Sequence, residues 1–345
     1  MANLAQKYRP KTLDEMTEQS VVVDIVRNIC ESETMSNRNF LFIGPAGVGK
    51  TSIAKIIART INENKGEPIE MDAASHSGVE DMRKIMEEAR QYPVGHKYKV
   101  FIIDEVHALS AAAWSAALTT LESQPARSVF IMCTTNVEKI PATIISRMQT
   151  FQLSKISLQG IYNRLVYIIH QENAEGRHIT YDDSAVLYIA KLAQGGMRDS
   201  ITLLDKALAY SENLTSETLQ MALGLPDFND YFTLLNAYAK KQNDTIIKVI
   251  NNVYNSGVNF IKWFEGFFSF VTNIVKYIYT KDINSTMIPS TYQDKIQGYS
   301  IAHAALCLKL SKMLVKMIQE LKGTQYLQEL AITYLCTPQT AQKGQ

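Results

Sequence analysis

The sequence predicts an α/β protein in which a parallel sheet is followed by a wholly helical region. Three observations lead to this fold class. Short apolar runs alternate with helical patterns between residues 39 and 153, a glycine-rich loop joins the first run to the first helix, and no strand-like run follows residue 153. Such alternation is typical of a parallel sheet with helices on both faces.

Four apolar runs are expected to form the strands of the sheet. They are FLFI at 40–43, PIEM at 68–71, KVFIID at 99–104 and SVFIMC at 128–133. The helical patterns between them are KTSIAKIIARTI, GVEDMRKIMEEARQ and AAAWSAALTTLES. Because the strands are apolar throughout, we expect both faces of each to be buried.

Beyond residue 153 apolar residues recur at helical spacing. About three helices are expected between 158 and 211, and the Gly and Pro of GLPDF at 224–228 indicate a boundary. Later helical patterns have broad apolar faces that require burial against other helices. The sequence thus predicts an α/β domain at 1–155, a helical lid at 156–224 and an all-helical domain at 225–345.

Composition excludes several classes of protein. The 345 residues carry 35 Lys and Arg against 34 Asp and Glu, so the net charge of +1 excludes a globally basic nucleic-acid binder. The four cysteines lack zinc-ligand spacing and indicate reduced thiols. No stretch approaches the ~18 apolar residues of a membrane span, and the N-terminus has no signal core. We expect a cytoplasmic protein with no membrane partner.

The glycine-rich loop GPAGVGKT matches the phosphate-binding pattern GxxxxGK[ST] in the context that this pattern requires, between a strand and a helix. Glycines let backbone N–H groups face the phosphates, and the helix adds its positive end. Lys50 is expected to reach the β- and γ-phosphates, and the Thr51 hydroxyl to bind Mg²⁺. The predicted nucleotide-binding residues here are Gly44, Pro45, Ala46, Gly47, Val48, Gly49, Lys50, Thr51 and Ser52.

The third apolar run ends in two acids, Asp104 and Glu105. Buried acids without partners are costly, so the plain alternative is a solvated loop start. Beside a phosphate-binding loop, the pair predicts that Asp104 holds the Mg²⁺ shell and that Glu105 polarises the attacking water. Together these elements predict hydrolysis of ATP with Mg²⁺. We expect His107 and Cys133 to be structural.

The chain resembles the AAA+ clamp-loader ATPases, and among them the gamma/tau subunits of bacterial DNA polymerase III. The resemblance is dense over residues 4–225 and is carried by KYRP, GPAGVGKT, DAASHSGVEDMR, FIIDEVHALS, CTTNVEKIPATIISR and GGMRDSITLLDKAL. It implies a nucleotide-binding sheet domain, a sensor 2 lid and a helical collar for oligomerisation. It also implies an ATPase that opens a sliding clamp and places it on primer-template DNA, within a ring or spiral of loader subunits that we expect to be pentameric.

The resemblance assigns roles to single residues. Thr134 or Thr135 corresponds to sensor 1, and Arg198 corresponds to sensor 2 rather than to a solvated arginine at a helix start. Arg147 corresponds to an arginine finger that acts on the nucleotide of a neighbouring subunit, and its alternative is a surface arginine paired with a carboxylate. The stretch that borders adenine in similar proteins corresponds to Tyr8, Arg9, Pro10, Val21 and Val22.

Two outer surfaces follow from the same resemblance. A helix start is expected to follow the DNA phosphate backbone, or else to be an ordinary solvated helix start; its residues are Ser75, His76, Ser77, Gly78 and Arg83. The same helix ends in an apolar tip formed by Tyr92, Pro93 and Val94. This tip is expected to contact the sliding clamp, unless it packs locally.

The chain departs from the family pattern in several places. A four-cysteine zinc module is absent after the P-loop helix, so we expect no zinc and a trimmed relative, from a bacterium or a phage-infected cell. Met148 stands where a cysteine usually follows the finger, and Thr119 stands where a lysine is common. The chain stops where longer relatives continue, so we expect it to lack their helicase- and polymerase-tethering segments.

Two other functions stay open at this point. A different AAA+ motor, such as a branch-migration ATPase, would need a winged-helix domain near the C-terminus, whereas residues 229–336 predict long helices. A subunit that binds ATP without hydrolysing it would predict damage to Lys50, Asp104 or Glu105, and all three are intact.

Overall fold

The computed structural model describes residues 3–32, 39–123 and 127–336 of the chain. Its centre is a parallel five-stranded sheet in the order β2-β3-β4-β1-β5. All four predicted runs are strands, so the predicted α/β class is confirmed. The strands are β1 (Asn39–Ile43), β2 (Ile69–Asp72), β3 (Lys99–Asp104), β4 (Ser128–Thr134) and β5 (Gln149–Gln152).

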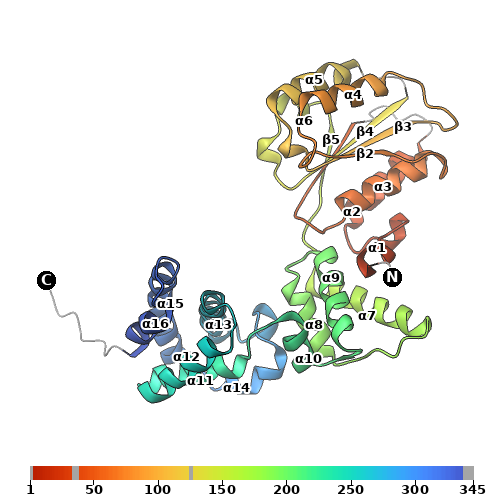
Figure 1. Cartoon of the computed structure of the whole chain (residues 1–345). Helices are drawn as coiled ribbons and strands as arrows, with labels where there is room; N and C mark the ends of the chain where they lie inside the picture. The colour runs from red at the N-terminus through yellow and green to blue at the C-terminus, as the bar shows by residue number, and fades with distance from the viewer. Residues whose placement is uncertain (1–2, 33–38, 124–126, 337–345) are drawn as a thin grey trace. The chain divides into compact units, whose positions relative to one another are not determined.

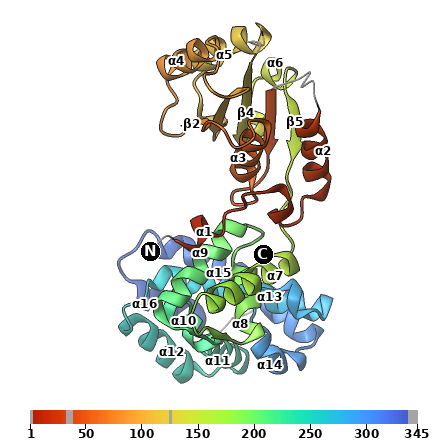
Figure 2. The same cartoon turned by 90° about the vertical axis from the view of Figure 1, so that its right-hand side faces the viewer.

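Helices cover both faces of this sheet because successive side chains of a strand point to opposite faces. In β1, Phe40 and Phe42 belong to the core beneath α2 and α3, whereas Leu41 and Ile43 belong to the core beneath α4, α5 and α6. Figures 1 and 2 show these two layers. The helices are α2 (Ser20–Glu31), α3 (Lys50–Ile61), α4 (Val79–Ala89), α5 (Ala111–Ser123) and α6 (Ala142–Ile145).

The two edge strands differ from the expectation. Burial on both faces holds for β1 and β4, in which every residue is buried. It is wrong for β2, where Glu70 and Asp72 are exposed because the strand lies at the sheet edge. Strand β5 was not predicted, because Phe151 is its only buried residue and no apolar run marks it.

After the sheet the chain is mainly helical. Helices α7 (Leu158–Ala174), α8 (Asp183–Leu192) and α9 (Met197–Tyr210) occupy the stretch expected to form a lid, and α10 (Ser216–Leu223) follows. The expectation of a wholly helical region is wrong here, because two short strands, β6 (Thr180–Tyr181) and β7 (Asn213–Leu214), pair in parallel and are too short to form an apolar run. Short elements in the first half of the chain are α1 (Leu4–Lys7), η1 (Leu13–Glu15), η2 (Val106–Ala108) and η3 (Val137–Lys139).

Residues 228–336 contain helices and 3₁₀ turns, with no strand among them. Their aromatic core includes Tyr231, whose hydroxyl donates to the Trp263 carbonyl oxygen at 3.0 Å. The elements are α11 (Phe228–Lys240), α12 (Asn243–Asn255), α13 (Phe260–Thr280), η4 (Ile283–Ser285), η5 (Ser290–Tyr292), α14 (Gln293–Gln297), α15 (Ile301–Leu321) and α16 (Leu327–Cys336). Within the described ranges, no helix has the length and apolar character needed to cross a lipid bilayer.

The chain forms two compact units. One comprises Met1–Arg177 with Ile189–Asp205, and the other comprises His178–Tyr188 with Lys206–Gln345. The first unit holds the sheet, the P-loop, helix α7 and the first turns of α9. The predicted division into three domains, with boundaries near 155 and 224, stays a prediction.

Candidate nucleotide site

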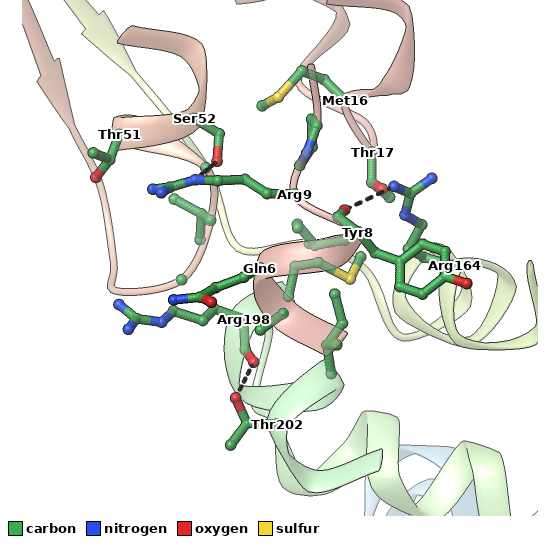
Figure 3. A pocket seen from close by; sticks show the side chains of 18 of the residues that line it. Gln6, Tyr8, Arg9, Met16, Thr17, Thr51, Ser52, Arg164, Arg198 and Thr202 are labelled. Atoms are coloured by element: carbon green, nitrogen blue, oxygen red, sulfur yellow. Dashed lines mark hydrogen bonds between the residues drawn. The ribbon is translucent and has the colours of Figure 1, made fainter. Parts of the chain in front are cut away.

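A pocket of about 390 Å³ opens beside the glycine-rich loop, within the first unit. Four segments distant in sequence form its walls (Figure 3). They are the N-terminal arm (residues 3–17), the loop with the start of α3, the segment that leads into α7 with the first part of that helix, and the start of α9. The lining residues are Asn3, Ala5, Gln6, Tyr8, Arg9, Pro10, Met16, Thr17, Gly47, Val48, Gly49, Lys50, Thr51, Ser52, Ile156, Arg164, Met197, Arg198, Ile201 and Thr202.

The loop has the backbone that its glycines predict. Gly47 and Gly49 have φ values of +73° and +110°, a region that residues with a Cβ rarely adopt. Lys50 is buried, and its Nζ donates to the carbonyl oxygens of Gly44 at 2.9 Å and Pro45 at 2.8 Å. Burial lowers the pKa of the Lys50 ammonium. A cation held in a loop at a helix N-terminus suits an anionic ligand such as a phosphate group.

Thr51 and Asp104 meet at the carboxyl end of the sheet. The Thr51 hydroxyl donates to Asp104 Oδ2 at 2.5 Å, although 53 residues separate the two positions. Hydroxyl and carboxylate oxygens are ligands that Mg²⁺ accepts. The two side chains therefore fit the ion in the positions that the sequence predicted for it.

Glu105 follows β3 in a strained backbone conformation, with φ at +48°. Its Oε2 accepts from the Thr135 hydroxyl at 3.2 Å and lies 3.2 Å from His107 Nδ1. His107 Nδ1 is also 3.1 Å from Thr134 Oγ1. Both sensor 1 candidates are thus connected to Glu105, Thr135 directly and Thr134 through His107.

His107 has a more specific place than the structural role that we expected for it. A neutral imidazole with its proton on Nδ1 can donate to both Glu105 and Thr134, while the Thr134 hydroxyl donates to the Asn136 carbonyl oxygen at 3.2 Å. One feature of the sequence could have indicated this contact: His107 lies two residues after Glu105, at the same end of the strand.

The first turn of α9 contacts the glycine-rich loop. The backbone N–H groups of Met197 and Arg198 donate to the Gly47 carbonyl oxygen at 3.0 and 3.4 Å. The Arg198 side chain lines the pocket with Arg164 of α7, whose Nη2 donates to the Tyr8 carbonyl oxygen at 3.1 Å (Figure 3). The sequence predicted Arg198 but not Arg164, because an arginine in an amphipathic helix carries no signal of its own.

The residues predicted to border adenine separate into two groups. Tyr8, Arg9 and Pro10 line the pocket, and Arg9 Nε donates to Ser52 Oγ at 3.3 Å. Val21 is 70% exposed and Val22 is buried in the core, and neither is among the lining residues. Of the glycine-rich loop, the residues from Gly47 onward line the pocket, whereas Gly44, Pro45 and Ala46 do not.

A buried carboxylate fixes the N-terminal arm to helix α7. Glu172 accepts from Lys7 Nζ at 2.6 Å and from the Tyr8 hydroxyl at 2.7 Å, and Arg177 lies 3.4 Å away. Burial alone would raise the pKa of Glu172, but the bonds from Lys7 and Tyr8 outweigh it and hold that pKa below its ordinary value. Burial and the bond to Glu172 raise the pKa of Tyr8 to about 12.

Arg147 is not among the residues that line this pocket. It follows α6, and its Nη2 lies 2.6 Å from Glu122 Oε1, while Nη1 donates to the Thr143 carbonyl oxygen at 2.6 Å. In the single chain the arginine therefore has the carboxylate partner that the alternative interpretation expected.

The predicted DNA-facing helix start is mixed in charge. The Ser75 hydroxyl donates to Asp72 at 3.2 Å, and Gly78 precedes α4. The first turn carries Glu80 and Asp81, and Arg83 forms an ion pair with Glu80 at 2.7 Å. His76 and Ser77 lie between Ser75 and Gly78.

The predicted clamp-facing tip is open to solvent. The exposed fractions of Tyr92 and Val94, on either side of Pro93, are 72% and 88%. The guanidinium of Arg127 lies 5.9 Å from the centre of the Tyr92 ring, a cation–π distance.

Two family models match the chain. The model for the ATPase family associated with various cellular activities (AAA) matches residues 40–155. The model for the DNA polymerase III clamp loader subunit, ATPase lid domain, matches residues 160–213. The first match contains the glycine-rich loop and the Asp104–Glu105 pair, and the second contains Arg164 and Arg198.

Curated relatives are similar to the chain over most of its length. DNA polymerase III subunit gamma of Buchnera aphidicola subsp. Baizongia pistaciae is 30% identical over 85% of this chain and 84% of the relative. Subunit gamma/tau of Mycoplasma genitalium is 30% identical over 88% of the chain, and subunit tau/gamma of Haemophilus influenzae is 34% identical over 72%. The chain spans 54% and 39% of the lengths of these last two relatives.

Solved structures of Thermotoga maritima RuvB have a similar fold. One, titled a Holliday junction branch migration motor, is 20% identical with a TM-score of 0.52, over 67% of this chain and 78% of RuvB. At this identity the likeness concerns the fold alone.

Proposed function

The chain belongs to the family of DNA polymerase III gamma and tau subunits, and on that premise we propose that it is an ATPase motor subunit of a sliding-clamp loader. It uses ATP binding and hydrolysis to open the clamp and to place it on primer-template DNA. The observation that carries the proposal is a pair of contacts around the glycine-rich loop. The Thr51 hydroxyl donates to Asp104, and the Gly47 carbonyl oxygen accepts from the first turn of α9. A scaffold subunit that bound ATP without hydrolysing it would share these contacts but would not need Glu105 held by Thr135 and His107.

ATP is the substrate, and the residues around it have separate tasks. Lys50 exchanges its bonds to the loop carbonyls for bonds to the phosphates. Thr51 and Asp104 hold Mg²⁺, which supplies charge that neutralises the phosphate oxygens. Glu105 orients the attacking water, and Arg198 reaches the phosphates from the lid.

Thr134 and Thr135 share the sensor 1 task. Thr135 contacts Glu105 directly, so a change at the γ-phosphate that moves Thr135 also moves the carboxylate. Thr134 is buried and reaches Glu105 through His107. His107 therefore acts as a positioning residue for Glu105.

Arg147 acts in trans, on the nucleotide of the neighbouring subunit. Its position outside the pocket of its own chain supports this role. On assembly the guanidinium leaves Glu122 and stabilises charge that develops on the transferred phosphoryl group. Arginine fingers contribute about 10³- to 10⁵-fold in rate.

The proposed partners are other loader subunits in a ring or spiral, pentameric by our expectation, with the sliding clamp and primer-template DNA. Residues 225–345 form the oligomerising collar, and the exposed Tyr92 and Val94 contact the clamp. The DNA-facing helix start contributes backbone N–H groups more than charge, because Glu80 neutralises Arg83. We place the protein in the cytoplasm of a bacterial or phage-infected cell, with Mg²⁺ as its metal and without zinc.

A branch-migration motor is the alternative function. The fold likeness to RuvB does not favour it, because that likeness concerns the fold alone. The described residues 228–336 contain no strand, whereas a winged-helix domain needs a hairpin.

A clamp-loading assay tests the proposal. The full chain, assembled with its loader subunits, is incubated with ATP, clamp and singly primed circular DNA, and the clamp retained on DNA is measured by gel filtration. Wild type should retain the clamp, and Lys50→Ala should not. Lys55→Ala is the matched control, because Lys55 lies on the same helix but pairs with Glu70 outside the pocket. Equal loading by Lys50→Ala, or without ATP, would contradict the proposal.

A further inference from the structure

Two neighbouring residues before α2 have a backbone that side chains disfavour. Glu18 and Gln19 both have φ at +59°, in the left-handed region. Such strain persists only where surrounding contacts determine it, and it gathers at functional sites. The contacts of both side chains lead to one short segment, residues 153–157, which joins β5 to helix α7.

Gln19 binds this segment through both ends of its side-chain amide. Its Nε2 donates to the Ser154 carbonyl oxygen at 2.7 Å, and its Oε1 accepts from the Ser154 N–H at 3.1 Å. The amide thus binds both the N–H and the carbonyl oxygen of Ser154, as the backbone of a neighbouring strand would. Ile156, two residues further on, donates its N–H to the Gly195 carbonyl oxygen at 3.1 Å.

Glu18 binds the start of α7. Its Oε2 accepts from the Ser157 N–H at 3.0 Å, and its Oε1 accepts from the Ser157 hydroxyl. The hydroxyl oxygen in turn accepts from the Gly160 N–H at 3.0 Å and caps the helix. A carboxylate at a helix N-terminus is also favoured by the helix dipole.

Gly160 makes room for this carboxylate. A Cβ on Gly160 would overlap Glu18 Oε1. A larger residue at this position of α7 would therefore displace the Glu18 carboxylate from Ser157.

The linker and the strained pair both adjoin the nucleotide pocket. Met16 and Thr17, just before the pair, line the pocket (Figure 3). Ile156 of the linker also lines it. Helix α7 carries Arg164, which lines the pocket one helical turn after Gly160. A shift at the start of α7 would move this arginine relative to the P-loop.

We infer that Glu18 and Gln19 are positioning residues that hold the 153–157 linker and thereby set where α7 and Arg164 stand beside the nucleotide. We call this pair the Glu18–Gln19 latch. The effect of the latch on ATP binding rests on the proposed function, whereas its hydrogen bonds to the start of α7 do not. The latch lowers the cost of ordering the lid when ATP binds, so its loss weakens ATP binding more than it slows the chemical step.

Two variants approach the latch from opposite sides. Glu18→Gly removes the carboxylate, and glycine adopts φ at +59° without strain, so the turn itself is kept. Gly160→Ala keeps both latch residues but puts a methyl group where the Glu18 carboxylate lies and so displaces it. Glu15→Gln is the control, because Glu15 is an acid of the same N-terminal segment that accepts from the Lys11 N–H at 2.9 Å and does not line the nucleotide pocket.

Two readouts test the inference on the full chain. Hydrogen exchange of residues 154–161, measured by mass spectrometry without nucleotide, should be about fivefold or more faster in both variants, the scale of one lost hydrogen bond. The KM for ATP should rise about tenfold with kcat within about twofold, the scale of one or two net hydrogen bonds. Glu15→Gln should match wild type in both.

The outcomes separate the inference from the proposed function. Unchanged hydrogen exchange in both variants would show that the latch does not hold the start of α7. Faster exchange with an unchanged KM for ATP would show that the latch holds α7 without influencing the nucleotide site, and would overturn that part of the inference. A kcat that falls while KM stays constant would contradict it as well. If the wild-type chain binds no ATP, the proposed function fails. Hydrogen exchange would still show whether the latch holds the start of α7.

Discussion

Replacement of Arg147 by alanine should leave the fold and ATP affinity nearly intact while removing most DNA-stimulated turnover. The structural cost follows from the contacts. The ion pair with Glu122 is short, but the side chains are 35% and 48% exposed, so solvent screening limits it to about 1 kcal/mol. The bond from Nη1 to the Thr143 carbonyl oxygen adds about 1 kcal/mol. A loss near 2 kcal/mol leaves a protein of ordinary stability folded.

The catalytic cost is larger. An arginine finger contributes about 10³- to 10⁵-fold in rate, which corresponds to about 4 to 7 kcal/mol of transition-state stabilisation. The free energy that Arg147 contributes to catalysis is therefore larger than the free energy that it contributes to folding. One set of variants separates the two contributions.

The assay compares Arg147→Ala with Glu122→Gln in the assembled loader. Glu122→Gln weakens the same ion pair but keeps the guanidinium, so its turnover should match wild type. DNA-stimulated ATP hydrolysis, equilibrium binding of a fluorescent ATP analogue and chemical denaturation are measured for each. Normal turnover in Arg147→Ala would refute the trans role. An equal fall of turnover in both variants would show that the surface pair, rather than the arginine as a finger, is what matters.

The remaining predictions concern the chemistry and the N-terminal arm. Glu105→Gln should bind ATP normally but retain it unhydrolysed in a filter-binding assay; normal turnover would exclude Glu105 as the group that polarises water. His107→Ala should lower kcat by roughly three- to tenfold, the scale of one lost hydrogen bond, with the KM for ATP unchanged; a raised KM alone would contradict its positioning of Glu105. Glu172→Gln should lower the unfolding free energy at pH 7 by about 2 kcal/mol, because it removes charge from bonds to Lys7 and Tyr8. Since the folded pKa of Glu172 is lowered, this difference should be constant above about pH 5 and shrink as pH falls below the ordinary carboxyl pKa of about 4, because the unfolded chain then binds a proton that the folded chain still excludes; a difference that grew on acidification would be inconsistent with the ion pairs.

Local sequence patterns predicted the strands whose burial is nearly complete. Strands β1, β3 and β4 are recognisable in the sequence as apolar runs, because a strand covered on both faces has few polar side chains. Strand β5 forms because β1 offers it an edge, and its only buried residue is Phe151. Tertiary pairing, which a local pattern does not contain, therefore decided the fifth strand.

The phosphate end of the site was predictable, and the walls of the pocket were not. The glycine-rich loop and the Asp104–Glu105 pair each have a backbone geometry that is fixed within a few residues. The opposite wall of the pocket depends on segments about 150 residues apart, as in the contact between Arg164 and Tyr8. Val21 and Val22 show the limit of transfer from a family pattern, since one faces solvent and the other joins the core.

The strained pair Glu18 and Gln19 was also beyond local reasoning. Neither residue type predicts a positive φ, and the contacts that hold them there lie 135 or more positions away. Only the folded chain brings their side chains to the linker before α7.

The ATPase rate of the chain, with and without primed DNA and the sliding clamp of the same replication system, tests the central claim most directly. A motor subunit of a clamp loader should hydrolyse ATP slowly alone and faster when DNA and clamp are both present in the assembled complex. A rate that neither DNA nor clamp changes would contradict the account.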